Sequence, residues 1–385
     1  MSANERRAGA TRRTWLKRGA VLGGLSVLGM PKRLEGAPTG CGVTAGTGQN
    51  TEKNGQWSLD RVNAWYAATP WPVGCNFIPS TAVNQIETWQ AESFDPETID
   101  RELGLAAGLG FNTARVFFHD LVWEADPDGF KKRFDKFLDL GQKHRIRAIP
   151  TFFTNGCYHR DRTPKLGKQP DPVPGVHNSG WVQTPGAPSV NDPATWGRLE
   201  KYVKDVIGAF AKDERVLLWY LYNEPWNATK GAKSMPLMRE VFNWARAINP
   251  SQPITACLEC GAPLTPMNVF LVGVCDVLTF HSYSGAASVE SELKRYKAFK
   301  RPILCGEYMA RPGSTFQAIL PILKRERVMA MNFGLVAGKG NFYYRWGSKE
   351  GSPEPKVWFH DIFRKDGTPY DAEEVKLIRQ LTGVL

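Results

Sequence analysis

The chain has 385 residues, of which 42% are hydrophobic, and its formal net charge is +11. This length can bury a large core, and we favour one αβ barrel with long loops over two ordinary domains. Residues 1–37 contain eight basic and two acidic side chains, a net of +6, which leaves +5 for the remainder. Because that remaining charge is dispersed among acids, the composition argues against a nucleic-acid or anionic-membrane partner.

The first 37 residues resemble an export signal. Residues 11–17 read TRRTWLK, similar to a twin-arginine motif with Trp in the usual place of Phe, and a mildly apolar run follows at 19–30. These twelve residues are too few to span a bilayer, so we expect no stable membrane insertion. The twin-arginine translocase would then deliver the folded protein to the periplasm or the exterior. A basic disordered tail and a lipid anchor at Cys41 stay open as alternatives.

Residues 38–69 are predicted to form a linker or N-terminal extension, because 39–58 are rich in Gly and Thr. Residues 70–385 are predicted to form the catalytic domain. The chain has seven irregularly spaced cysteines. Cys257 and Cys260 resemble half of a zinc site, but no second pair stands at metal spacing, so we expect a structural or disulfide role and no metal.

Beyond residue 70, short apolar runs alternate with amphipathic stretches, which is typical of β–α units around a parallel sheet. Apolar residues spaced by three and four predict helices packed on the outside of that sheet. The sequence therefore predicts a (β/α)8 TIM barrel. The expected strands are 73–78, 113–119, 147–154, 216–223, 253–259, 277–283, 302–307 and 341–346, and the expected helices are 96–109, 128–143, 194–211, 233–248, 289–299 and 315–333.

The segment 155–191 interrupts this alternation. It is rich in Pro and Gly, contains His177 and Trp181, and has neither helix nor strand periodicity. Loops of this length inside a compact domain are usually functional. We expect it to wall one end of a substrate cleft, where a closed end would favour exo action and an open cleft would favour endo action.

Polar side chains gather at the ends of the expected strands, which is where barrels of this kind place their chemistry. Glu224 follows the apolar run 217–222 within Asn-Glu-Pro, and Glu307 ends the run 303–306. Two carboxylates from separate strands are what glycoside cleavage with retention requires. The other polar or aromatic residues at strand ends are Asn76, Arg115, His119, Asp120, Asn155, Asn223, Glu259, His281, Tyr283 and Trp346.

Four of these motifs together resemble the clan A retaining glycoside hydrolases. Asn223-Glu224-Pro225 ends the fourth expected strand, His281-Ser282-Tyr283 the sixth, Gly306-Glu307 the seventh and Trp346 the eighth. Family 5, the cellulase and mannanase group, is the closest, and the resemblance covers roughly residues 70–380. It implies hydrolysis of β-linked polysaccharides or oligosaccharides by double displacement, without a cofactor.

The resemblance also implies roles for the two acids. Glu224 would be the general acid/base, with a pKa raised by burial and neighbouring negative charge. Glu307 would be the ionised nucleophile that forms a covalent glycosyl-enzyme intermediate. In retaining enzymes the two carboxyl groups stand about 5 to 5.5 Å apart.

Supporting roles follow from the same resemblance. Asn223 would donate to the sugar 2-hydroxyl, while Tyr283 and Arg115 would hold Glu307 in its anionic form. His281 would bind a sugar hydroxyl or orient Glu224, and Trp346 would form the floor of the subsite. The alternative for these residues is a polar network without substrate contact and, for Trp346, core packing. Asn76, His119 and Asn155 complete the set of expected substrate-binding residues.

The sequence departs from family 5 in one place. Members usually have a histidine at the end of the third strand, where Thr154-Asn155 stands here, and His119-Asp120 follows the second strand instead. We therefore expect rearranged contacts to the sugar hydroxyls.

Other functions are less well supported. A barrel that binds carbohydrate without cleaving it would not need both glutamates, whereas a transglycosylase would use the same residues. The chain has no HExxH metal motif, no G-x-S-x-G elbow and no dinucleotide-binding glycine pattern.

Overall fold

The computed structural model describes residues 55–156, 163–227, 233–259 and 265–385. The expected twin-arginine segment and Cys41 lie outside these residues, as does Cys260 of the Cys257/Cys260 pair. Within the described residues, no helix is both long enough and apolar enough to cross a bilayer.

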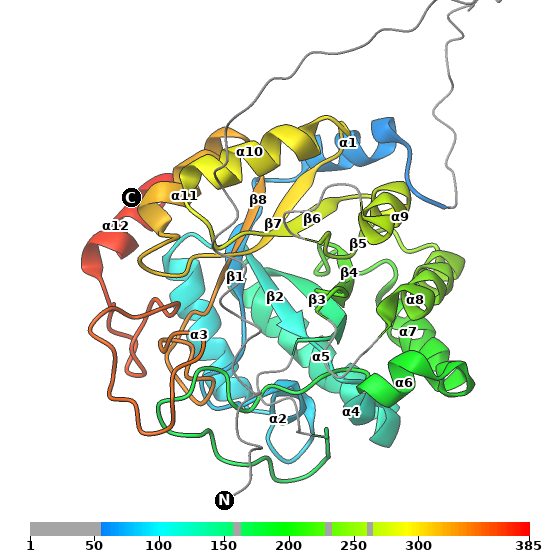
Figure 1. Ribbon diagram of the computed structural model, residues 1–385, viewed down its shortest axis with the longest axis horizontal. Helices are drawn as coiled ribbons and strands as arrows, with labels where there is room; N and C mark the ends of the chain where they lie inside the picture. Colours follow the sequence, from blue (N-terminus) through cyan, green and yellow to red (C-terminus); the bar gives the residue numbers. More distant parts are fainter. Residues whose placement is uncertain (1–54, 157–162, 228–232, 260–264) are drawn as a thin grey trace, which may run out of the picture. The chain divides into compact units, whose positions relative to one another are not determined.

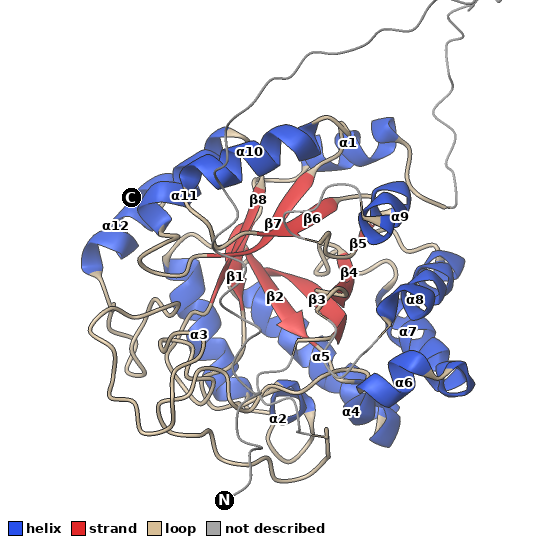
Figure 2. Ribbon diagram, viewed as in Figure 1, coloured by secondary structure: helices blue, strands red, loops and turns tan. Residues whose placement is uncertain are grey.

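Eight parallel strands form one sheet in the order β5-β4-β3-β2-β1-β8-β7-β6. A parallel bridge between Cys257 and Thr279 joins the two outer strands and brings the sheet round into a barrel (Figures 1 and 2). The predicted (β/α)8 fold is therefore confirmed. The strands are β1 (Val73–Asn76), β2 (Thr113–Phe117), β3 (Arg147–Thr154), β4 (Trp219–Asn223), β5 (Ile254–Thr255), β6 (Leu278–His281), β7 (Ile303–Tyr308) and β8 (Met329–Phe333).

The prediction of the eighth strand was wrong. Residues 341–346 lie in a loop, and β8 falls at the end of the stretch predicted as the helix 315–333. The helix there ends at Arg325, and Arg327 turns the chain with a left-handed φ of 51°. No Gly or Pro marks this turn, so the apolar residues of the helix and the strand read as one continuous pattern.

Helices cover the outside of the barrel (Figure 2). In α7 the residues Leu199, Val203, Val206 and Phe210 are buried at helical spacing, which packs this face on the sheet. The helices are α1 (Leu59–Ala68), α2 (Gln85–Trp89), α3 (Pro96–Gly108), α4 (Asp120–Ala125), α5 (Pro127–Lys143), α6 (Ala187–Asn191), α7 (Trp196–Phe210), α8 (Ser234–Ile248), α9 (Pro266–Val274), α10 (Ala286–Lys297), α11 (Phe316–Arg325) and α12 (Ala372–Thr382), with the 3₁₀ turn η1 (Pro193–Thr195).

The helix α1 belongs to the segment predicted as a linker or extension. Trp57 and Tyr66 are buried in one cluster with residues from the barrel interior. The Trp57 N–H donates to Asp276 Oδ1 at 2.8 Å, and the Tyr66 hydroxyl donates to the Arg327 carbonyl at 2.5 Å. Both acceptors precede strands, so this segment packs at the amino ends of β6 and β8, and the compact domain includes residues before 70.

The cysteines that the structure describes are Cys75, Cys257, Cys275 and Cys305, and all four are buried. Two of them, Cys75 and Cys305, lie within β1 and β7. These four pack as small side chains of the core, and for Cys257 a structural or disulfide role was expected.

A buried acid in the loop after β8 predicts how stability changes with pH. Burial raises the pKa of Asp361 to about 7, opposed by the charge of Arg311 and reinforced by that of Glu102. The folded pKa lies above the ordinary value of 3.8, so this stabilising term is complete below that value and is lost as the pH rises through about 7.

We expect Asp361→Asn to raise the free energy of unfolding at pH 8 by about 2 kcal/mol. The difference from wild type should shrink at pH 5. Thermal melts at both pH values measure it, with the exposed Glu350→Gln as control. A variant that is destabilised equally at both pH values would contradict the assignment.

Candidate active site

The end of β4 carries both Asn223 and Glu224 to the mouth of the barrel. Leu218 and Tyr220 face the barrel interior, whereas Trp219 and Leu221 pack outward. Glu224 then adopts a left-handed backbone with φ of 45°, a conformation that non-glycine residues rarely occupy and that is concentrated at functional sites. With this turn, the alternation of inward and outward side chains along β4 ends.

Glu307 comes from β7, where the strand register with β6 and with β8 is irregular. Its Oε1 receives an Arg115 N–H at 3.0 Å, and its Oε2 accepts the Tyr283 hydroxyl hydrogen at 2.7 Å. Burial and the charge of Glu307 raise the pKa of Tyr283 well above its ordinary value, so the phenol keeps this hydrogen. A side chain at position 306 would crowd His281, since a Cβ on Gly306 would lie 3.0 Å from His281 Nε2.

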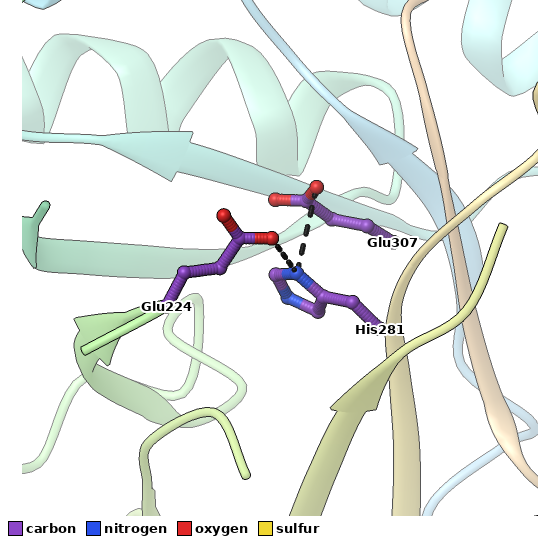
Figure 3. A group of neighbouring side chains, drawn as sticks. All are labelled: Glu224, His281 and Glu307. Atoms are coloured by element: carbon purple, nitrogen blue, oxygen red, sulfur yellow. Dashed lines mark hydrogen bonds and ion pairs between the residues drawn. The ribbon is translucent and has the colours of Figure 1, made fainter. Parts of the chain in front are cut away.

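His281 stands between the two glutamates (Figure 3). Its Nδ1 lies 2.9 Å from Glu224 Oε1 and 3.5 Å from Glu307 Oε2. One oxygen of each carboxylate and one His281 nitrogen all lie within 4.8 Å of one another. The two acids therefore face the same small space, as attack on one anomeric carbon requires.

The same three side chains could geometrically hold a cation. Positive charge is already supplied there by Arg115, whose side chain is fully buried against Glu307. Both oxygens of Glu307 also accept hydrogen bonds from this arginine and Tyr283. These contacts are those of a carboxylate held in place by hydrogen-bond donors, rather than those of a carboxylate that binds a metal ion.

The pKa of Glu224 differs from the expectation. Burial pushes it upward, but the hydrogen bond with His281, with further help from Asn227 and Arg115, brings it below the ordinary value. The predicted rise is therefore wrong for the free protein. The physical reason is that His281 lies closer to Glu224 than the negative charge of Glu307 does.

Arg115 organises the floor of the site. It donates to Asn76 Oδ1 at 2.7 Å, to Asn223 Oδ1 at 2.5 Å and to Thr151 Oγ1 at 3.1 Å. Asn76 in turn donates to the Gly306 carbonyl at 2.9 Å, beside Glu307. Asn76, Arg115 and Asn223 are thus brought together beneath the acids, as a network that positions Glu307.

Two expected substrate-binding residues make hydrogen bonds within the protein. His119 is buried at the amino end of α4, where its Nδ1 accepts the Leu121 N–H at 3.2 Å. Asn155 donates to the Pro225 carbonyl at 2.8 Å and accepts the Tyr222 hydroxyl hydrogen at 2.8 Å. Their contacts hold the start of α4 and the chain that follows Glu224, which indicates positioning rather than sugar binding.

Trp346 does not end a strand as predicted, because it lies in the loop after β8. It is nevertheless close to the acids: its ring centroid lies 4.8 Å from that of Tyr283, edge to face, and 4.8 Å from that of Phe359. With 44% of its surface exposed, its ring is available to a ligand. The loop after β8 therefore brings Trp346 near the acids, although this residue does not end a strand.

Tyr220 was missed by the sequence analysis. It is fully buried, its hydroxyl lies 3.0 Å from His281 Nε2, and its ring faces the Arg115 guanidinium at 4.0 Å. Burial raises its pKa well above the ordinary value, so it keeps its hydrogen. In the tautomer of His281 whose Nε2 accepts this hydrogen, Nδ1 carries the imidazole proton and donates to Glu224.

We expect Tyr220→Phe to lower kcat/KM about tenfold, the effect of one hydrogen bond near a charged group. Without the hydroxyl, His281 can turn Nδ1 into an acceptor, which favours protonated Glu224. The alkaline limb of the pH profile of kcat/KM should therefore move to higher pH. The control is Tyr202→Phe, another fully buried tyrosine, on α7. If the pH profile of kcat/KM for Tyr220→Phe keeps both limbs of the wild-type profile, Tyr220 has only a structural role.

Comparison with known proteins shows what the fold of this chain is similar to. No family model and no curated protein matches the chain. Solved structures do: GH5_18 from Streptomyces cattleya, in complex with Manb1-4GlcNAc, has a TM-score of 0.57 at 12% identity, over 82% of this chain and 80% of that one. The chain has the fold of family 5 glycoside hydrolases.

Two further solved structures are similar over most of their length. The endo-beta-1,4-mannanase from Thermotoga petrophila has a TM-score of 0.51 at 15% identity, over 81% of this chain and 77% of that one. The glycoside hydrolase family 5 mannosidase from Rhizomucor miehei has a TM-score of 0.51 at 15% identity, over 80% and 92%. At these low identities the likeness shows the fold alone, and the site chemistry rests on the geometry above.

Proposed function

We propose that the protein is a retaining glycoside hydrolase that cleaves β-glycosidic bonds by double displacement. The observation that carries this proposal is the pair of glutamates from β4 and β7, with oxygens within 4.8 Å. Their unequal surroundings add support, because Glu307 is held by two donors while Glu224 is the more exposed of the two, with 23% of its side-chain surface accessible.

In the first step, Glu307 attacks the anomeric carbon while Glu224 gives a proton to the leaving oxygen. Arg115 and Tyr283 fix the attacking carboxylate in one orientation. Asn223 is 6% exposed and lies beside Glu224, which suits a contact to the 2-hydroxyl as the ring gains positive charge.

In the second step, Glu224 removes a proton from water, which attacks the anomeric carbon on the face that the leaving group vacated and displaces the Glu307 carboxylate. The lowered pKa of Glu224 in the free protein favours the ionised form, which a base must have before it accepts a proton. The acid role in the first step requires kcat/KM to fall as the pH rises through that pKa. We therefore expect an acidic pH optimum.

The substrate class is proposed from the similar structures. One contains Manb1-4GlcNAc, one is an endo-beta-1,4-mannanase and one is a mannosidase. We propose β-mannosides as the first substrates to test, with β-glucosides and β-xylosides as the comparison.

Aryl β-glycosides of these sugars, with the product anomer followed by NMR from the first minute, test the proposal. The β anomer should appear first and then mutarotate. An initial α anomer would show inversion and contradict double displacement. Hydrolysis of none of the aryl glycosides would favour the alternative of a carbohydrate-binding barrel.

A further inference from the structure

Three loops on the carboxyl side of the barrel hold one another in place. They are the segment 77–95 after β1, the described part 163–186 of the loop after β3, and the segment 334–371 after β8 (Figure 1). These three loops together are here called the wall. The first two are joined where Asn84 Nδ2 donates to Gln169 Oε1 at 2.9 Å and to the Gly180 carbonyl at 3.0 Å. The first two loops of the wall are therefore fixed to each other by hydrogen bonds.

The other two pairs of loops are joined as closely. The Asn178 N–H donates to the Gly340 carbonyl at 2.9 Å, and His177 Nδ1 lies 2.7 Å from the Tyr344 carbonyl. Lys339 links the third loop to the first, through its N–H to the Ser80 carbonyl at 2.9 Å. Contacts on all three sides make separate movement of any one loop costly.

The wall is linked to Glu307 through Phe117 and Arg115. Its Trp181 packs edge to face on Phe117 of β2, with ring centroids 4.9 Å apart, and is only 5% exposed. The Phe117 ring lies 4.5 Å from the Arg115 guanidinium, which bonds Glu307. Phe342 of the third loop is buried in the same cluster. Apolar side chains thus fill the space next to the floor of the site.

The positions of the acids define the direction of a bound sugar chain. The leaving oxygen must lie beside Glu224, so the departing part of the substrate lies toward β4. The sugar that becomes attached to Glu307 then lies over Arg115, Asn76 and Tyr283, which come from β2, β1 and the end of β6. Any further sugar on its non-reducing side would extend toward β1, β2 and β8, where the wall stands.

We propose that the wall closes the site beyond a single sugar, so that the enzyme removes terminal sugars one at a time from the non-reducing end of its substrate. This inference rests on the proposed glycosidase function and adds the substrate class, oligosaccharides and glycoconjugates with a free non-reducing end. Shape, rather than an additional catalytic group, excludes internal positions of a polysaccharide.

The test uses a β-linked pentasaccharide of the sugar preferred among the aryl glycosides, labelled with a fluorophore at its reducing end. The early products should be the labelled tetrasaccharide and free monosaccharide alone, and a polysaccharide of the same sugar should keep its viscosity while monosaccharide accumulates. Labelled di- or trisaccharide at early times, or a rapid fall in viscosity, would overturn the inference. Failure to cleave any aryl glycoside would instead contradict the proposed function.

A variant pair tests whether the wall is the cause. Trp181→Ala should open the closed side and raise the share of early internal cleavage at least tenfold. Trp123→Ala removes a tryptophan that is also buried, 8% exposed, but that bonds Asp205 outside the wall, and it should keep the wild-type products. A folded Trp181→Ala enzyme with wild-type products would overturn the assignment to this side. If Trp181→Ala does not fold, the products of the wild-type enzyme still show whether it removes only terminal sugars.

Discussion

Glu307→Ala should reduce hydrolysis of β-glycosides by at least about 10⁴-fold, about 5.5 kcal/mol in activation free energy. The carboxylate is the group that forms the bond to the anomeric carbon, and no other described acid shares its contacts with Arg115 and Tyr283. Steady-state rates on a dinitrophenyl β-glycoside measure the loss. Glu307→Gln keeps the size of the side chain and should lose as much.

Azide distinguishes a lost nucleophile from a damaged fold. In Glu307→Ala a small anion can occupy the vacated space and attack from that face, which gives the α-glycosyl azide. Recovery of rate with this inverted product supports the role of Glu307. A variant that keeps more than about a tenth of wild-type activity, with its melting temperature unchanged, would exclude Glu307 as the nucleophile.

Glu224→Ala should have an effect that depends on the leaving group. A general acid contributes roughly 10² to 10⁴-fold, so hydrolysis of an unactivated oligosaccharide should fall by that factor. Dinitrophenolate leaves without a proton, so formation of the glycosyl-enzyme from the dinitrophenyl glycoside should slow far less. Burst kinetics on the dinitrophenyl glycoside and steady-state rates on the oligosaccharide measure the two cases.

The same variant has two further signatures. The alkaline limb of its pH profile should disappear, because that limb reports the proton on Glu224. Azide should yield the β-glycosyl azide, the opposite anomer from Glu307→Ala, since it replaces water on the face that Glu224 serves. Equal losses of activity on both kinds of substrate would show that Glu224 acts only in packing. If Glu224→Ala gave the α-glycosyl azide and Glu307→Ala the β-glycosyl azide, Glu224 would be the nucleophile and Glu307 the acid/base.

The barrel and its two acids were predictable because each depends on a local pattern. An apolar strand that ends abruptly in a carboxylate can be read from neighbouring residues, as at Asn223-Glu224-Pro225. The boundary between α11 and β8 could not be read this way, since a left-handed turn at Arg327 replaces the usual Gly or Pro. That error also misplaced Trp346, although its contact with Tyr283 keeps it near the site.

Features that depend on distant contacts were missed. Tyr220 looks like an ordinary core aromatic in the strand sequence, and its partner His281 is 61 residues away. The pKa of Glu224 was predicted in the wrong direction because the distance from His281 decides it. The segment 155–191 was expected to wall a cleft, but the loops that lock its described part in place could not be identified from periodicity.

The central claim is that Glu307 forms a covalent bond to the sugar. A 2-deoxy-2-fluoro glycosyl fluoride slows breakdown of this intermediate, and mass spectrometry of the digested protein then locates the attached sugar. The account predicts one sugar per protein, on the peptide that contains Glu307, with slow release and recovery of activity. Attachment to Glu224 or to another residue, or inactivation without attachment, would contradict it.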